Sequence, residues 1–73
     1  MRKIHFMYDS IGYIYQRDAD TLTVTDNDQQ TTTARLDPAK EYWLGDFGTM
    51  HVSQFNSDLQ LARYIAGFSQ INL

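Results

Sequence analysis

The chain contains no cysteine, a single proline and no long run of apolar residues. Without cysteine, neither a disulfide nor a thiolate metal site can stabilise the fold, so the core must hold by packing alone. A helix needs about 18 consecutive apolar residues to span a bilayer, and no such stretch is present. Arg2 and Lys3 open the chain, but His5 and Asp9 interrupt the apolar segment that a signal peptide requires, so we expect a cytoplasmic protein.

Basic residues are also scarce. Six Lys and Arg stand against nine Asp and Glu, which gives a net charge of −3. Nonspecific binding to nucleic acid or to anionic lipid requires a positive surface. The basic residues are scattered, and Arg2 and Lys3 alone are adjacent. The charge balance therefore disfavours both partners.

Apolar and aromatic residues are plentiful for so short a chain. Hydrophobic residues make up 42% of the 73 positions and include five Tyr, four Phe and one Trp. This fraction suits a small globule and exceeds that of a disordered chain. With no internal repeat, linker or low-complexity tract, residues 1–73 are expected to form one small domain.

The clearest local pattern predicts a helix over Ser57–Phe68. Ser57 and Gln60 have the spacing of a capping box, and Gly67 lies where a left-handed residue ends many helices. One face of this helix is apolar at the 3,4 spacing, through Leu61, Ala62, Ile65 and Ala66. About ten helical residues are marginal alone in water, so we expect the helix to lie on a sheet.

Strands are indicated by alternation of apolar and polar residues. In residues 3–8, Ile4, Phe6 and Tyr8 share one face. The same pattern predicts further strands at Tyr13–Gln16, Thr21–Thr25, Thr31–Leu36 and Thr49–Phe55. The expected fold class is α+β, a four- or five-stranded antiparallel β-meander with one C-terminal amphipathic helix packed on one face.

Two hairpin registers follow from the turns. If a four-residue loop joins the first two strands, Tyr8 lies opposite Tyr13 and Phe6 opposite Tyr15. In the later hairpin the register pairs Thr25 with Thr31, Thr23 with Thr33, and Leu22 with Ala34.

Residues 38–47 leave two alternatives open. Asp37-Pro38 can begin a helix that runs to Leu44 and ends at Gly45. Equally, Pro38-Ala39-Lys40 can be a turn before a strand at Glu41–Phe47.

Catalytic and metal-binding patterns are weak. His5 and His51 fall on different strands with no third ligand indicated, and they are best explained as partly exposed residues. Asp26-Asn27-Asp28 begins like a calcium loop, but the following residues lack its glycine and glutamate. Serines have no nucleophile elbow, and Gly45-Asp46-Phe47-Gly48 lacks the lysine of a phosphate loop. We expect no enzyme activity, no metal and no cofactor.

Aromatic residues are the remaining signal. Phe6, Tyr8, Tyr13 and Tyr15 either form the core beneath the helix or stack single-stranded nucleic acid. If they are core, Met7 and Ile14 form an apolar pair on the opposite face, and the predicted binding residues are Trp43, Met7, Ile14, Tyr42 and Phe47. The expected function is a non-enzymatic protein-interaction module that binds another protein or a second copy of itself as a homodimer. Regulators and inhibitors carried by phages or other mobile elements are of this type. Single-stranded nucleic-acid binding through the tyrosine strand is the alternative.

Overall fold

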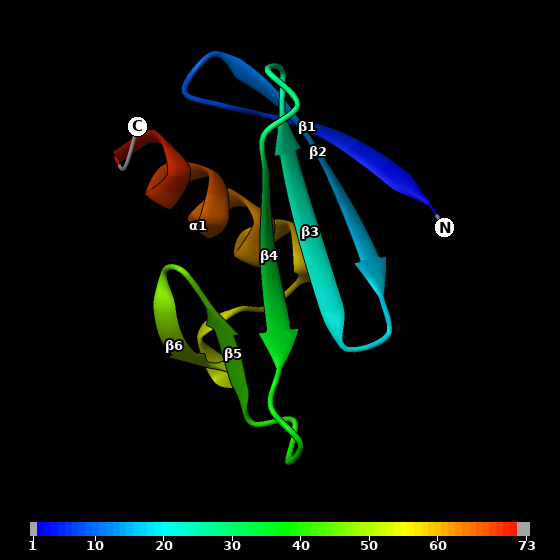
Figure 1. The fold of residues 1–73 in the computed structure, drawn as a ribbon, viewed down its shortest axis with the longest axis vertical. Coiled ribbons are helices and arrows are strands. Elements are labelled where there is room, and N and C mark those ends of the chain that lie inside the picture. Colours follow the sequence, from blue (N-terminus) through cyan, green and yellow to red (C-terminus); the bar gives the residue numbers. More distant parts are fainter. Residues whose placement is uncertain (1, 72–73) are drawn as a thin grey trace.

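The structure is a computed structural model and describes residues 2–71. It is an α+β fold in which six antiparallel strands form a meander and one helix packs on the sheet (Figure 1). The spatial order β1-β2-β3-β4-β5-β6 is also the order in the sequence. The elements are β1 (Lys3–Tyr8), β2 (Ile11–Asp18), β3 (Thr21–Asp26), β4 (Thr31–Leu36), β5 (Tyr42–Gly45), β6 (Gly48–His51), a 3₁₀ turn (Val52–Gln54) and α1 (Asp58–Ile71). The fold class is confirmed, with more strands than the four or five that the sequence predicts.

Helix α1 covers the face of the sheet that carries the tyrosine rings. Tyr13 is 4% exposed and Tyr15 is 8% exposed. They share the core with Leu22, Val24, Ala34 and Trp43 from the sheet and with Leu61, Ala62, Ile65 and Ala66 from the helix. The opposite face, called the outer face below, carries the polar residues of the alternating strands, including five threonines of β3 and β4: Thr21, Thr23, Thr25, Thr31 and Thr33.

The start of α1 is capped as predicted, and its end is different. The amide of Gln60 donates to Ser57 Oγ at 3.2 Å, while Gln60 Oε1 accepts from the amide of Asn56 at 2.7 Å. The helix continues through Gly67 to Ile71, so the predicted end at Gly67 is wrong.

The first hairpin has a tighter turn than predicted. Tyr8 pairs with Ile11, and Phe6 pairs with Tyr13. Between them Asp9 and Ser10 have φ of 53° and 66°, the positive values of a two-residue type I′ turn, whose twist matches the flanking strands. The predicted four-residue loop is wrong. Because the error in register is an even number of residues, every side chain stays on its predicted face.

The hairpin of β3 and β4 has the predicted register. Thr25 pairs with Thr31, Thr23 with Thr33, and Leu22 with Ala34. Its loop is held by one Asp26 carboxylate oxygen, which accepts from the amides of Asp28 at 2.8 Å and Gln30 at 2.9 Å.

Neither alternative for residues 38–47 is right over its whole length. Lys40 has a φ of 60°, which no right-handed helix accommodates. The Asp37 carboxylate, which could have capped a helix, instead accepts from the amides of Glu41 at 2.7 Å and Tyr42 at 3.1 Å. These bonds close the connection from β4 to β5 and favour a strand.

That strand is shorter than predicted, because the chain turns after Gly45. Gly45 pairs with Gly48, which makes Asp46-Phe47 the turn of a β5–β6 hairpin. The predicted last strand at Thr49–Phe55 is correct only as far as His51, since Val52–Gln54 forms the 3₁₀ turn that leads towards α1.

Candidate binding surface

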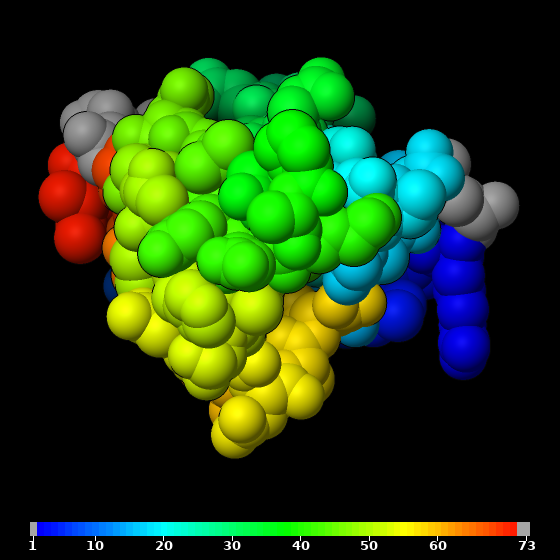
Figure 2. All heavy atoms as spheres, turned by 90° about the horizontal axis from the view of Figure 1, so that it is seen from below, coloured from blue at the N-terminus to red at the C-terminus, as the bar shows by residue number. Residues whose placement is uncertain are grey.

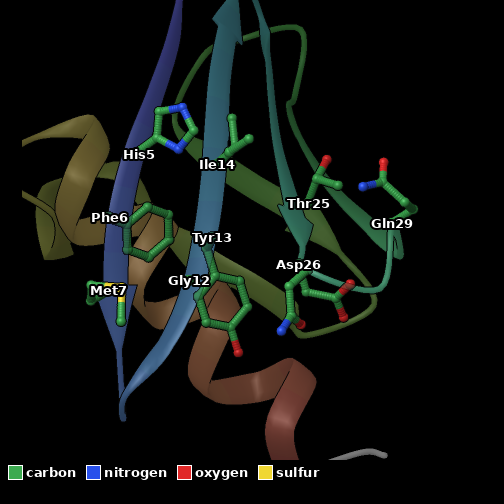
Figure 3. A pocket seen from close by; sticks show the side chains of 10 residues that line it. His5, Phe6, Met7, Gly12, Tyr13, Ile14, Thr25, Asp26 and Gln29 are labelled. Carbon is green, nitrogen blue, oxygen red and sulfur yellow. The ribbon is translucent and has the colours of Figure 1, made fainter.

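A shallow hollow of about 350 Å³ lies on the outer face, at the end of the sheet where β1, β2 and β3 meet (Figure 3). Its apolar lining residues include Met7 and Ile14 from the outer face, together with Phe6 and Tyr13. In the ladder of β1 and β2, Met7 pairs with Gly12 and His5 pairs with Ile14. The structure thus brings together two of the predicted binding residues in what we call the Met7–Ile14 hollow.

Gly12 explains why the surface is hollow here. A Cβ at this position would meet only the Met7 sulfur, at 3.7 Å, so the space beside the strand is open. The cross-strand partner of Met7 is Gly12, which has no side chain, and Met7 is 59% exposed. A strand glycine often marks a place where another chain or ligand approaches closely. The sequence pattern had placed Gly12 in the turn, so this signal was missed.

Polar groups at the rim come from His5, Thr25 and the β3–β4 loop. The Asp26 carboxylate at the rim already accepts two backbone amides of its own loop. Among residues 2–71, no group of three or more His, Asp or Glu side chains is arranged to hold a metal ion. An apolar floor with a polar rim is also found in many protein interfaces and ligand sites.

Strand β1 is an edge of the sheet and lies beside this hollow. In a two-residue hairpin the flanking pair, here Tyr8 and Ile11, exchanges backbone hydrogen bonds, and bonded pairs then alternate along the ladder. The N–H and C=O groups of Lys3, His5 and Met7 therefore point away from β2. We call these outward groups the β1 edge. Arg63 Nη1 donates to the Met7 carbonyl oxygen at 3.2 Å, which agrees with this direction.

Three basic residues lie near the β1 edge, and one exposed acidic residue, Asp9, follows it in the turn. Arg17 and Lys40 form the ion pairs recorded within residues 2–71, with Asp58 and Asp20, each at 2.6 Å. Arg2 and Lys3 are exposed at one end of β1, and Arg63 reaches the other end from α1, its guanidinium 5.3 Å from the centre of the Tyr8 ring. A chain of net charge −3 therefore carries Arg2, Lys3 and Arg63, called the basic stripe below, at the two ends of one sheet edge.

Trp43 is not part of this surface. Its side chain is 5% exposed and belongs to the core, under the guanidinium of Arg17 at 5.0 Å. The same guanidinium bonds Asp58 at the start of α1. This arrangement joins the end of β2, β5 and the helix, so Trp43 has a packing role in the free chain.

Tyr42 and Phe47 are also separated from the Met7–Ile14 hollow. Tyr42 lies on the outer face but three strands away from Ile14, with its ring edge-on to His51 at 5.2 Å. Phe47 points to the helix side and contacts the rings of Tyr64 at 5.8 Å and Phe68 at 6.4 Å. Tyr64 and Phe55 extend this second, partly exposed aromatic cluster.

No family model, curated protein or solved structure matches the chain. In the described part of the chain, no helix is long and apolar enough to cross a membrane. The fold and the surface define a small α+β domain with an open sheet edge beside an apolar hollow.

Proposed function

We propose that the chain is a non-enzymatic protein-interaction module of the regulator or inhibitor type, which binds another protein through the Met7–Ile14 hollow and the adjoining β1 edge. The observation that carries this proposal is the exposure of Met7 beside Ile14, in a hollow that Gly12 leaves open. Methionine is enriched in protein interfaces because its flexible, polarizable side chain adapts to different partners.

The hollow suits a protein better than a substrate. It is open and has an apolar floor, and its one carboxylate is bonded to backbone amides of the β3–β4 loop. A catalytic site would need a nucleophile or base held in reach of a substrate and oriented by a third group. The surface offers His5 without such a partner.

The alternative function, binding of single-stranded nucleic acid by stacking of bases on the tyrosine strand, is less well supported. That alternative requires the rings of the tyrosine strand to be open to bases. Tyr13 and Tyr15 are buried beneath α1, and Phe6 stacks on Tyr13 at 5.4 Å on the same face. The basic stripe alone does not supply a stacking platform.

The proposal can be tested with a Met7→Asp variant. A tagged chain is expressed in its source cells, and the proteins retained with it are quantified by mass spectrometry. We expect Met7→Asp to lose the specific partner, which is then purified and titrated against both chains. Because Met7 is exposed, the variant should keep the wild-type melting temperature.

Thr49→Asp is the matched control. Thr49 is an exposed residue on the same outer face, but it belongs to β6 at the far edge of the sheet. Retention of the partner by Thr49→Asp and its loss from Met7→Asp would support the proposal. Equal retention by both variants, or the absence of any partner above background, would contradict it.

A further inference from the structure

We infer that the partner presents an extended acidic segment, which adds to β1 as a seventh strand of the sheet. The inference rests on the proposed function and goes further, because it names the conformation and charge of what is bound. Strand addition at an exposed sheet edge is a known mode of peptide recognition, in which backbone hydrogen bonds supply affinity and side-chain pockets supply specificity.

The β1 edge has the unpaired groups that such a strand needs. Lys3, His5 and Met7 each direct an N–H and a C=O away from β2, and one of these six groups, the Met7 carbonyl, accepts from Arg63. No other backbone hydrogen bond is recorded for them within residues 2–71. The strand contains no proline and no bulge in its pairing with β2, devices that usually protect an edge.

The opposite edge is a poorer site. Strand β6 spans four residues, Gly48–His51, and begins at a glycine with a φ of 105°. It then passes at once into the 3₁₀ turn at Val52, whose amide donates to the Glu41 carbonyl at 2.9 Å. By contrast, β1 spans six residues at the flank of the molecule, where Figure 2 shows the N-terminal segment in blue.

Charge selects an acidic segment. Arg2 and Lys3 at one end of β1 and Arg63 at the other form no ion pair within residues 2–71. Carboxylates on an added strand would meet cations at both ends. Arg63 is exposed, so its guanidinium can turn from the Met7 carbonyl to a partner's carboxylate, and this would release that carbonyl to the new ladder.

The two faces of the edge define alternate side chains of the segment. On the helix side, Ile4 and Phe6 are half-buried against the core and leave part of their apolar surface at the edge. On the outer face, the segment would lie beside Lys3, His5 and the exposed Met7 of the hollow. We therefore expect apolar residues directed to the helix side, beside Ile4 and Phe6, to alternate with acidic residues directed to the outer face, with one carboxylate at the Met7 end of the edge, where Arg63 can reach it.

A second copy of this chain fits less well. Antiparallel pairing of two β1 strands about His5 places Lys3 of each copy opposite Met7 of the other. Because Arg63 bonds the Met7 carbonyl of its own copy, this pairing brings Arg63 of one copy towards Lys3 of the other. Like charges placed across strands are destabilising.

The test uses a seven-residue peptide of alternating Glu and Val, blocked at both ends, and NMR of the ¹⁵N-labelled full chain. We expect the amide signals of Lys3, His5 and Met7 to shift on titration, with binding weakened by added salt. Two further peptides serve as controls: one with Lys in place of Glu, and one with alternate backbone amides N-methylated. Both should produce no shifts at β1, since the first reverses the charge and the second removes the donors.

Variants of the chain test the same two elements. His5→Pro removes one outward N–H, a change that an edge strand tolerates because this group makes no bond to β2. We expect at least a tenfold loss of peptide affinity, whereas His5→Ala keeps the donor and should retain binding. The double variant Lys3→Glu/Arg63→Glu should also lose at least tenfold, whereas Arg35→Glu, an exposed charge on β4, should not.

Five outcomes are decisive. Shifts confined to β1 that require Glu side chains and free peptide amides would support strand addition. No shift at millimolar peptide, or shifts centred elsewhere, would overturn it. Concentration-dependent dimerisation abolished by His5→Pro would assign the edge to a second copy, and displacement of the peptide by a single-stranded oligonucleotide would assign it to nucleic acid. If the cellular partner is lost with Met7→Asp but kept with His5→Pro, the proposed function stands and strand addition fails.

Discussion

The hydroxyl oxygen of Tyr8 lies 2.9 Å from the point where Gly67 would carry a Cβ, and the ring carbon bearing that hydroxyl lies at 3.3 Å. Glycine inside a helix normally costs about 1 kcal/mol relative to alanine. Here the lack of a side chain at Gly67 allows α1 to approach Tyr8 of β1 closely. Gly67 was predicted to end the helix, but it is a packing residue.

A double-mutant cycle checks this relationship. In a Tyr8→Ala background, Gly67→Ala should raise the free energy of unfolding by about 1 kcal/mol, because only the helix preference remains. In the wild-type chain the same change should give no gain or a loss, because the ring must move. Urea unfolding measures all four proteins. Additive effects of the two substitutions would contradict the close contact.

The type I′ turn at Asp9-Ser10 is strained for its residues. A non-glycine residue in the left-handed region costs about 1–2 kcal/mol, and Ser10 has a φ of 66°. We expect Ser10→Gly to raise the free energy of unfolding by about 1 kcal/mol, as measured by urea or thermal unfolding. Asp28→Gly is the comparison, because Asp28 is not among the residues with positive φ, and it should not stabilise the chain.

The loop before β5 should make stability depend on acid pH. Hydrogen bonds from backbone amides, chiefly that of Tyr42, hold the pKa of the Asp37 carboxyl below its ordinary value. The ionised form is thus favoured in the folded chain. The ionised Asp37 carboxylate contributes fully to the stability of the folded chain above its pKa in the unfolded chain, about 4. This contribution is lost as the pH falls through the lower pKa of the folded chain.

Asp37→Asn should therefore melt at a lower temperature than the wild type at pH 7, and the two melting temperatures should converge as the pH falls below about 4. Melting curves across this range, followed by circular dichroism, give the comparison. A difference that stays constant down to pH 2.5 would show that the charge of Asp37 contributes nothing.

The buried face of α1 should dominate its contribution to stability. Ile65 is fully buried, and Ile65→Ala should lower the free energy of unfolding by about 2–5 kcal/mol through lost contacts and a cavity. Leu59 on the same helix is 40% exposed, and Leu59→Ala should cost clearly less. If the two losses measured by urea unfolding were equal, the helix would not pack on the sheet as described.

The sequence predicted which face of each strand is buried better than it predicted where strands turn. Alternation assigns every residue of β1 and β3 to a face, and packing enforces that assignment because one face must be dry. Thr25 and Thr31 could be paired correctly since the threonine pattern is continuous on both strands. Asp9 and Ser10 could not be recognised as a two-residue turn, because neither is a glycine and their left-handed conformations are imposed by the strands they join.

The candidate site was predicted in part. Met7 and Ile14 were placed on one face by alternation alone, and the structure brings them together. The hollow between them depends on Gly12, whose role appears only when the turn is two residues long. Arg63 could not be connected with β1 from the sequence, since 56 positions separate it from Met7 and only the docking of α1 brings the two together.

The agreement between strand order in the sequence and in space also has a kinetic consequence. Every ladder joins neighbours along the chain, so most of the sheet forms by closing short loops, and proteins rich in such local contacts fold quickly for their class. Docking of α1 onto β1 closes by far the longest loop, at an entropic cost that grows only with the logarithm of its length. A sheet formed before that step would expose its aromatic side to solvent, and transiently exposed apolar surface of this kind promotes aggregation.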